Sequence, residues 1–403
     1  MLVDANNQLL YVEPQVDGAD VADGVAGPLA VPIDASGTFA LHSRPGSRRV
    51  VYLDFDGHTI SGTAWNGATA GPCYADAYDS DGVPGSFSQA ELEAISGVWA
   101  RVAEDYAPFD VDVTTADPGP SAITRSSLFD QRYGTRVLVT NSRTLCANGK
   151  TLYSSVCSGG CGGIAYVGVF DRTTNHAFYQ PAFVFQNGVG SGQKNIAEVG
   201  AHEAGHTLGL SHDGSATSAY YRGHGSWAPI MGVGYYEAIT QWSRGEYAGA
   251  TQTQDDFAVM QTNGALPLVD DHSESSPTPL DTSTPRSGII STRSDVDAFS
   301  ITVADETSIT LAAVPAATSP NLDIALTLHG PGVDLVDDPP SGSTSADIAT
   351  GLGATIAATI AAGTYTVRVD GVGAGNPLDT GYSDYASIGA YSVSLTAKAV
   401  DEP

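Results

Sequence analysis

Residues 202–213 read HEAGHTLGLSHD, and the spacing of the three histidines in this segment restricts how the chain can fold. His202 and His206 are four residues apart, so on a helix they share one face, with Cβ atoms about 5–6 Å apart. A continued helix would carry His212 about 15 Å along its axis from His202. Gly209 lies where the helix must end, because glycine adopts the left-handed C-terminal conformation without a steric penalty. We therefore predict a helix, a glycine corner and a loop that brings His212 back to the other two histidines.

Three imidazoles placed in this way form a typical ligand set for Zn²⁺, which binds histidine nitrogen at about 2.0–2.1 Å. Three protein ligands leave a fourth coordination position open, which is typical of catalytic zinc and not of structural zinc. Glu203 is not needed as a ligand, and its carboxylate is placed to take a proton from a water bound to zinc. We predict one catalytic Zn²⁺ per chain, bound by His202, His206 and His212.

The pattern H-E-x-x-H-x-x-G-x-x-H resembles the metzincin clan of zinc endopeptidases. The segment APIMG places Met231 where that clan has a methionine turn beneath the metal. Asp213, directly after the third histidine, is similar to the adamalysin (reprolysin) branch and to bacterial relatives. The resemblance covers roughly residues 50–265 and implies a zinc metalloendopeptidase that hydrolyses peptide bonds of protein substrates. The segment that follows Gly163 resembles the strand that pairs with extended substrate in that branch, namely Ile164, Ala165, Tyr166, Val167 and Gly168.

Two features depart from the pattern of related families. Val233 stands where astacins and serralysins have a tyrosine that ligates zinc or stabilises the oxyanion. Tyr235 and Tyr236 lie nearby, and either one lines the S1′ pocket or assists the oxyanion. No cysteine precedes Cys73, so the sequence given lacks the propeptide cysteine that keeps matrixin and adamalysin zymogens latent. An aspartate among the first 49 residues is the alternative latency group.

The elements before the zinc motif predict an α+β domain. The apolar run VVYLDFDG at residues 50–57 is typical of a buried strand, and the capping-box residues Ser88 and Glu91 begin a helix over about 89–106. The order of strand, helix, four strands and helix indicates a mixed sheet with helices packed on it, which agrees with the metzincin catalytic domain. The other predicted strands are 111–115, 136–140, 164–170 and 182–185, and the other predicted helices are 195–208 and 252–260.

The C-terminal region has a different texture. Short alternating runs, separated by Gly, Pro and Asp, predict a small all-β sandwich with strands near 298–303, 308–312, 324–328, 364–369 and 391–396. Its segments DVDAF, from Asp295, and GTYTVRV, from Gly363, resemble the bacterial pre-peptidase C-terminal (PPC) domain of secreted peptidases. We divide the chain into a propeptide remnant or extended lead-in (1–49), the peptidase domain (50–267), a linker (268–285) and the PPC-like sandwich (286–403).

Composition indicates where such a protein works. The 403-residue chain carries a formal net charge of -28, which argues against nucleic-acid partners and against adhesion to anionic membranes. No apolar run is long enough to span a bilayer, and the first residues lack the features of a signal peptide, so we take the sequence given to begin after one. We expect a secreted, extracellular monomer of bacterial type whose partners are protein or peptide substrates. An even set of cysteines suits two disulfides of undetermined pairing, formed by Cys73, Cys146, Cys157 and Cys161.

Other interpretations stay open at this point. Asp76, Asp79 and Asp81 resemble a calcium loop, but Ser88 stands where an EF-hand needs glutamate, so a solvated turn is favoured over structural Ca²⁺. The chain could instead be a carbohydrate or protein adhesin that uses the zinc domain as a scaffold. Glu203 argues against this, because a scaffold gains nothing from a general base beside an open metal site. Within the peptidases, a narrow-specificity toxin or processing enzyme is the alternative to a degradative enzyme.

Overall fold

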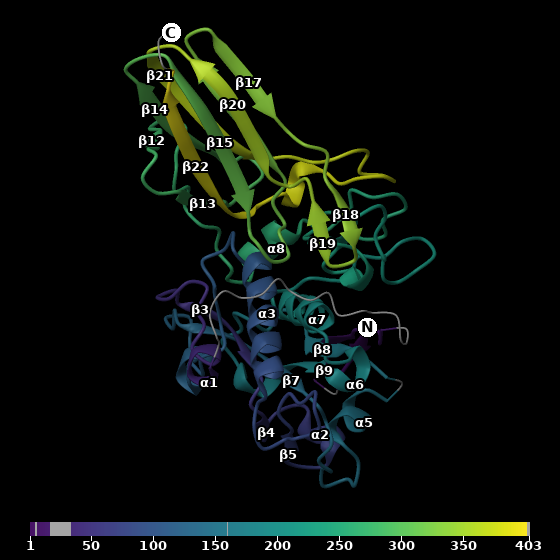
Figure 1. The fold of residues 1–403 in the computed structure, drawn as a ribbon. Coiled ribbons are helices and arrows are strands. Elements are labelled where there is room, and N and C mark those ends of the chain that lie inside the picture. The colour runs from purple at the N-terminus through teal and green to yellow at the C-terminus, as the bar shows by residue number, and fades with distance from the viewer. Residues whose placement is uncertain (5, 17–33, 159, 401–403) are drawn as a thin grey trace.

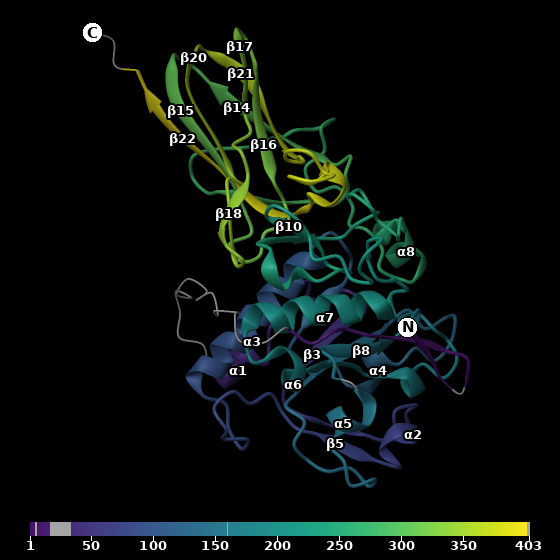
Figure 2. The same ribbon diagram turned by 90° about the vertical axis from the view of Figure 1, so that its right-hand side faces the viewer.

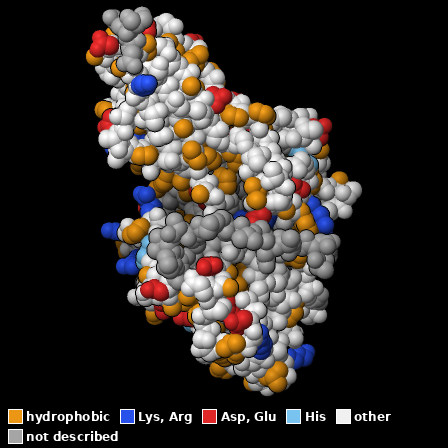
Figure 3. All heavy atoms as spheres, viewed as in Figure 1, with side chains coloured by type: hydrophobic (Ala, Val, Ile, Leu, Met, Phe, Trp, Pro, Cys, Tyr) orange, Lys and Arg blue, Asp and Glu red, His pale blue; other side chains and the backbone are white. Residues whose placement is uncertain are grey.

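The computed structural model describes residues 1–4, 6–16, 34–158 and 160–400. An N-terminal domain of mixed helix and sheet is followed by a C-terminal β-sandwich, and the two meet at a waist (Figures 1 and 3). The combination of helices and sheets confirms the predicted α+β class. In the part of the chain that is described, no helix is both long and apolar enough to cross a membrane.

A seven-stranded mixed sheet forms the centre of the N-terminal domain, in the order β1-β2-β8-β9-β7-β3-β6. β3 runs parallel to β6 and β7, and β7 runs parallel to β9, whereas β8 is antiparallel to β9. β3 and β7 are largely buried on both faces, with only Arg49 and Arg136 partly exposed, as expected for parallel strands covered on both sides. The strands are β1 (Leu2–Val3), β2 (Leu9–Val12), β3 (Arg49–Asp54), β6 (Asp112–Thr114), β7 (Tyr133–Thr140), β8 (Gly163–Tyr166) and β9 (Ala182–Phe185).

Two long helices, α3 (Gln89–Asp105) and α7 (Gln193–Thr207), pack against one another over this sheet (Figure 2). The predicted capping box begins α3: Ser88 Oγ accepts from the Glu91 amide, and the Glu91 carboxylate accepts from the Ser88 amide at 2.8 Å. α8 (Asp256–Thr262) begins four residues later than the predicted helix. Short helices are α1 (Ala35–Thr38), α2 (Asn66–Thr69), α4 (Pro120–Ile123), α5 (Leu152–Val156) and α6 (Gln186–Val189), with 3₁₀ turns at Ala177–Tyr179, Gly234–Tyr236 and Asp384–Ala386.

Small strand pairs and two disulfides complete this domain. β4 (His58–Ile60) pairs with β5 (Cys73–Ala75), and β10 (Trp227–Pro229) pairs with β11 (Ile239–Gln241). The pairing left open by the sequence is Cys73–Cys146 and Cys157–Cys161. The described part of the chain contains no free cysteine, which fits an oxidising compartment.

The N-terminal region is more ordered than an extended lead-in. β2 is the short apolar run LLYV, and it adds to the central sheet beside β8, whose remaining neighbour is β9. β1 pairs with β2 in turn, so the strand predicted to lie at the edge of the sheet is covered. Part of the predicted propeptide, residues 17–33, lies outside the described residues.

The C-terminal domain is the predicted sandwich, with a five-stranded sheet facing a four-stranded one. The first sheet contains β12 (Thr278–Pro279), β14 (Val296–Val303), β21 (Gly363–Gly371), β16 (Ile324–Gly330) and β17 (Val333–Asp337). The second contains β13 (Arg286–Ile290), β22 (Gly389–Ala399), β15 (Thr307–Pro315) and β20 (Ala354–Ile360), and the hairpin β18 (Gly342–Ser345) with β19 (Ile348–Thr350) extends from the sandwich. Alternate residues of the inner strands form its core, as the period-two pattern predicts.

The segment 268–285, predicted as a linker, is partly absorbed into the domains that it joins. Leu268 donates its amide to Pro108 of the first domain, whereas β12 pairs with β14 and Leu280 is buried in the sandwich core. The absence of periodicity in this segment therefore reflects a single short strand and several turns, because a two-residue strand is too short to produce a repeating pattern.

Candidate metal centre

Helix α7 carries the first two histidines of the motif, and the chain after it carries the third. α7 is capped at Leu208, and Gly209 follows with a φ of 98°. The amide of Gly209 bonds to the carbonyl of His206 at 2.9 Å, and the amide of Leu210 bonds to that of Gly205 at 3.1 Å. This is the glycine-terminated helix end that the sequence predicts, and it turns the chain so that His212 faces α7.

The three histidines converge. One ring nitrogen from each of His202, His206 and His212 lies within 4.8 Å of the others, and the Nε2 atoms of His206 and His212 are 3.0 Å apart. The Nδ1 atoms of His202 and His206 bond to the carbonyls of Ile230 and Leu210 at 2.9 and 2.8 Å. Such bonds fix the ring orientation and leave Nε2 free to bind a metal.

The environment keeps these imidazoles neutral, which is the form that binds metal. Burial lowers the pKa of His202 to about 4. Burial and the neighbouring histidines also lower the pKa values of His206 and His212. At neutral pH the cluster therefore presents three nitrogen lone pairs and no positive charge.

Two buried carboxylates face this cluster. Glu203 is fully buried, and neither of its carboxylate oxygens has a hydrogen-bond partner among the described residues. The Oε2 atom of Glu13 lies 3.0 Å from Nε2 of His202, and apart from this contact neither atom has a hydrogen-bond partner among the described residues. Burial, and then the proximity of the two carboxylates, raises the pKa of Glu203, and burial raises that of Glu13.

These unsatisfied atoms test whether the site fits a divalent cation. Leaving buried polar atoms unpaired costs roughly 1–3 kcal/mol each, so a set of them at one place requires an explanation. A cation among the three imidazoles would satisfy the Nε2 lone pairs and offset the charge of the nearby carboxylates. A set of three histidines with a carboxylate alongside matches the ligand preference of Zn²⁺. The residues present therefore fit the metal that the sequence predicts.

Met231 lies beneath α7, and Asp213 stabilises the loop around it. Met231 is fully buried, and a Cβ added to Gly205 would lie 2.9 Å from its sulfur, so the methionine packs against α7 at the residue before His206. The Asp213 amide bonds to the Met231 carbonyl at 2.8 Å, which ties the segment after the third histidine to this turn. Burial raises the pKa of the Asp213 carboxyl to about 7.

The two tyrosines predicted near the site differ in position. Tyr235 is buried, and its hydroxyl donates to Oε1 of Glu13 at 3.5 Å, so it faces the centre. The guanidinium carbon of Arg222 lies over the ring of Tyr236, 4.9 Å from the centroid of that ring. His224, between the zinc motif and the methionine turn, bonds through Nε2 to the carbonyl of Gly381 at 2.8 Å and so links the two domains.

Sequence reasoning missed three residues at the centre: Tyr11, Glu13 and Tyr220. The Tyr220 ring lies 4.2 Å from that of His212, and its hydroxyl donates to the Val12 carbonyl. Tyr220 could not be predicted, because it precedes the methionine turn and has no characteristic spacing from the zinc ligands. The run LLYV was the one signal that could have placed a strand next to Glu13.

The strand predicted to pair with substrate is shorter than expected. β8 ends at Tyr166, and Gly168 has a φ of 64°. The amide of Gly168 bonds to the carbonyl of His206 at 3.0 Å, so the chain turns onto the end of α7. β8 thereby lies directly beside the metal cluster.

Carboxylates converge at two further places. Ligand oxygens of Asp79, Asp81 and Glu91 lie within 4.8 Å of one another. Asp79 and Glu91 are buried and accept hydrogen bonds from the amides of Gly82 and Ser80, so this turn is less solvated than predicted. Oxygens of Asp270, Asp271 and Asp297 also lie within 4.8 Å of one another.

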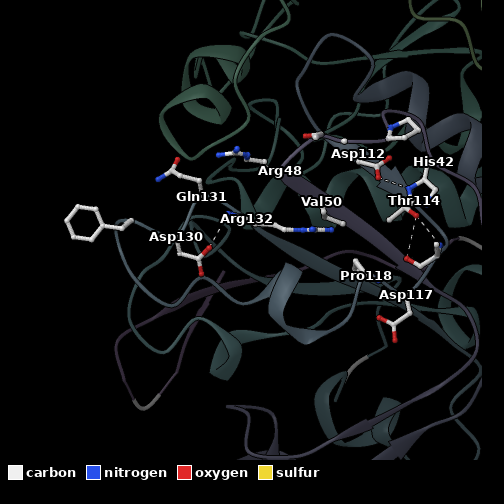
Figure 4. Close-up of a pocket in the computed structure, with 15 residues that line it drawn as sticks. His42, Arg48, Val50, Asp112, Thr114, Asp117, Pro118, Asp130, Gln131 and Arg132 are labelled. Atoms are coloured by element: carbon white, nitrogen blue, oxygen red, sulfur yellow. Dashed lines mark hydrogen bonds and ion pairs between the residues drawn. The ribbon is translucent and has the colours of Figure 1, made fainter.

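A cavity of about 650 Å³ lies away from the metal cluster, at the β6 end of the sheet (Figure 4). Its lining includes His42 and Asp112, whose side chains are joined at 2.7 Å, together with Arg48, Asp117 and Arg132. None of the residues at the metal centre lines it.

Comparison with known proteins supports a metallopeptidase. Residues 126–243 match the family model Reprolysin_5, described as metallo-peptidase family M12. The matched span includes β8, all three histidines, Glu203 and Met231. No curated protein gives a significant match to the chain.

Solved structures are similar to about a third of the chain. One is the pre-peptidase C-terminal domain of a collagenase from Bacillus anthracis, at 13% identity and a TM-score of 0.21, covering 30% of this chain and 94% of that one. Another is a periplasmic inhibitor of g-type lysozyme from Aeromonas hydrophila, at 11% identity and a TM-score of 0.21. This match covers 30% of the present chain and 96% of the inhibitor. Scores at this level carry no conclusion about function.

Proposed function

We propose that the chain is a secreted zinc-dependent endopeptidase of the adamalysin-like metzincin type. One observation carries the proposal: three neutral imidazoles converge beside the buried carboxylate of Glu203, which has no hydrogen-bond partner in the described part of the chain. The match of residues 126–243 to the M12 metallopeptidases supports it independently. An adhesin would have no use for a buried general base at such a cluster.

The metal would be held by His202, His206 and His212, and it would supply Lewis acidity that activates water and polarises the scissile carbonyl. Glu203 would accept the proton of the attacking water and later deliver it to the leaving amine. Burial raises the pKa of the Glu203 carboxyl, which favours the protonated form that the carboxyl group takes between the two steps.

Substrate would bind along β8. Of the residues predicted to pair with substrate, Ile164, Ala165 and Tyr166 lie in β8 beside the cluster, so an extended peptide would add to the sheet there by backbone hydrogen bonds. Val167 and Gly168 follow the strand, and the Gly168 amide is already bonded to the His206 carbonyl. We assign Tyr235 to the S1′ side of the centre and Tyr220 to the stabilisation of the oxyanion, since the Tyr220 hydroxyl already donates to a peptide carbonyl next to the cluster. Tyr236 would shape the pocket wall.

The remaining assignments follow from the sequence. We propose a monomer with a peptidase domain at residues 50–267 and a PPC-like domain at 286–403. Two disulfides and the acidic surface are consistent with an extracellular location.

The decisive experiment compares cleavage of an unbiased peptide library by the wild type and by Glu203→Ala, with zinc content measured for both. We expect a time-dependent set of products from the wild type and none from Glu203→Ala, while zinc stays bound to both. A zinc-loaded protein that cleaves nothing, both as the wild type and as a Glu13→Ala variant that lacks the carboxylate beside His202, would contradict the proposed function. Loss of zinc from Glu203→Ala would contradict the role of Glu203.

A further inference from the structure

Gly163, the first residue of β8, faces the side chain of Glu203. It is buried, it pairs with Val184 of β9, and its φ lies outside the left-handed region that favours glycine. The backbone at this position would therefore accept most residues. The absence of a side chain needs an explanation other than backbone conformation.

The explanation is space. α7 lies across β8 (Figure 2), and a Cβ atom at position 163 would lie 2.4 Å from Oε1 of Glu203 and 2.8 Å from its Cγ. The same Cβ would lie 2.6 Å from Cγ1 of Val199. Val199 and Glu203 are four residues apart on α7, so they project from one face of that helix. Both side chains therefore pack directly against the backbone of β8.

Neither side of this contact has room to give way. Glu203 is fully buried, in an interior where side chains are closely packed. On the other side, Gly163 is held by its pairing with Val184 in β9, and its carbonyl accepts a hydrogen bond from the Glu13 amide at 3.0 Å. A side chain at position 163 would thus displace either the Glu203 carboxylate or α7 itself.

The contact between α7 and its neighbours does not require glycine everywhere. Gly200 is also buried on α7, but a Cβ there would lie 3.7 Å from Cγ2 of Val102 and 4.0 Å from Cγ1 of Val137. Those are ordinary van der Waals distances. The need for glycine at position 163 is therefore specific to the residues that face it.

We propose that Gly163 is a positioning residue for the peptidase reaction: the space left by its missing side chain is the slot that holds the Glu203 carboxylate beside the three histidines. The proposal rests on the proposed function of Glu203 and identifies what sets its position. Neither oxygen of Glu203 has a hydrogen-bond partner among the described residues, so packing against β8 is what orients it. Because substrate is expected to bind along the same strand, β8 positions the base relative to the peptide bond.

The first experiment tests the contact without relying on catalysis. Gly163→Ala is introduced into two full-length, zinc-loaded backgrounds: Glu203→Gln, which keeps the shape of the side chain, and Glu203→Ala, which lacks its Cγ and terminal atoms. We expect Gly163→Ala to lower the urea midpoint in the first background, and by less than about half as much in the second. Equal decreases in both would show that position 163 does not meet Glu203, and would overturn the proposal.

The second experiment measures kcat and KM with a peptide selected from the library. We expect Gly163→Ala to lower kcat at least about tenfold, because a displacement of about 1 Å at a catalytic group has effects of this size. KM and zinc affinity should stay within about twofold of the wild type, since no substrate contact or histidine is changed. Gly200→Ala is the control and should keep the wild-type kcat. A wild-type kcat in Gly163→Ala, or a loss of zinc that accounts for its lower kcat, would overturn the proposal.

A third variant separates positioning of the base from packing of the helix, and provides folded protein if Gly163→Ala alone does not fold. Gly163→Ala/Val199→Ala removes the contact with Cγ1 of Val199 and keeps the contact with Glu203. We expect this double variant to regain part of the urea midpoint but to keep a kcat at least about tenfold below that of Val199→Ala. Equal kcat values for the double variant and Val199→Ala would show that Gly163 acts only through helix packing, and would overturn the proposal.

The unfolding experiment also distinguishes failure of this proposal from failure of the proposed function. A smaller decrease of the midpoint in the Glu203→Ala background, together with no cleavage by the wild type or by Glu13→Ala, would support the slot and contradict the peptidase.

Discussion

At the scale of the residue, Gly209 connects the helix of the motif to the third ligand. Its φ of 98° lies in the left-handed region, which is unfavourable for any residue that has a Cβ atom. A Cβ at this position would also meet Asn263 Nδ2 at 2.8 Å. Both effects oppose any side chain at the corner that turns His212 toward α7.

We expect Gly209→Ala to lower the free energy of unfolding by about 1–3 kcal/mol and to weaken zinc binding, because relief of the contact moves the loop that carries His212. Gly82→Ala is the matched control, since Gly82 has a φ of 84° but a Cβ there meets nothing within 4 Å. Denaturant unfolding and zinc titration measure both quantities. An equal loss in the two variants, with zinc affinity unchanged, would show that the Asn263 contact has no role.

At the scale of the element, α3 supports α7 and therefore the metal ligands. Tyr106, at the end of α3, donates its hydroxyl to the Ala201 carbonyl at 3.0 Å, one residue before His202. The capping box at Ser88 satisfies amides at the start of α3 that would otherwise have no partner within the helix. The stability of the site thus depends on a helix that contributes no ligand.

We predict that Ser88→Ala lowers the free energy of unfolding by about 1 kcal/mol, the usual cost of losing an N-cap side chain. Ser86→Ala is the control, because Ser86 is exposed and lies just outside the helix. Urea unfolding of both variants, made in the Glu203→Ala background to prevent self-digestion, gives the comparison. If both variants unfold at the same urea concentration, the cap does not stabilise α3.

At the scale of the whole molecule, buried polar contacts join the peptidase domain to the sandwich. Arg101 of α3 pairs with Asp347 at 2.5 Å, and Asn321 Nδ2 donates to Asp105 at 3.0 Å. Glu104, on the same helix as Arg101 and Asp105, accepts a hydrogen bond from the Ala390 amide of β22 at 3.2 Å. Contacts of this kind hold the two domains in a defined arrangement.

We predict that stability declines as the pH rises toward 8, in part because of Glu104. Burial raises the pKa of its carboxyl from 4.5 to about 8, so the folded state binds the proton more tightly than the unfolded state. The stability contribution is therefore fully present below about pH 4.5 and is lost as the pH rises through about 8. Glu104→Gln should reduce this pH dependence, and Glu93→Gln, exposed on the same helix, should not. Unfolding free energies at pH 5 and pH 9 provide the test; equal pH dependence in all proteins would contradict it.

Much of the fold was predictable because its signals are local. The zinc motif encodes its geometry within eleven residues, through the helical repeat and a glycine whose conformation is special. The strands β3, β7 and β9 and the helices α3 and α7 were predicted to within a few residues, since their apolar periods and caps lie within each segment. The sandwich was predicted for the same reason.

The contacts that cover the metal centre depend instead on residues far apart in the chain. Glu13 contacts His202 across a sequence separation of 189 residues (202 − 13), and β2 pairs with β8 through backbone hydrogen bonds that leave no mark on composition. A four-residue strand is too short to establish a period, and strand pairing depends on which edge the folded sheet leaves open. The same holds for the pairing of Cys73 with Cys146 and for the position of Tyr220. Local spacing determines which side chains can bind the metal, whereas long-range packing determines what else reaches it, because burial and strand pairing exist only once the sheet has formed.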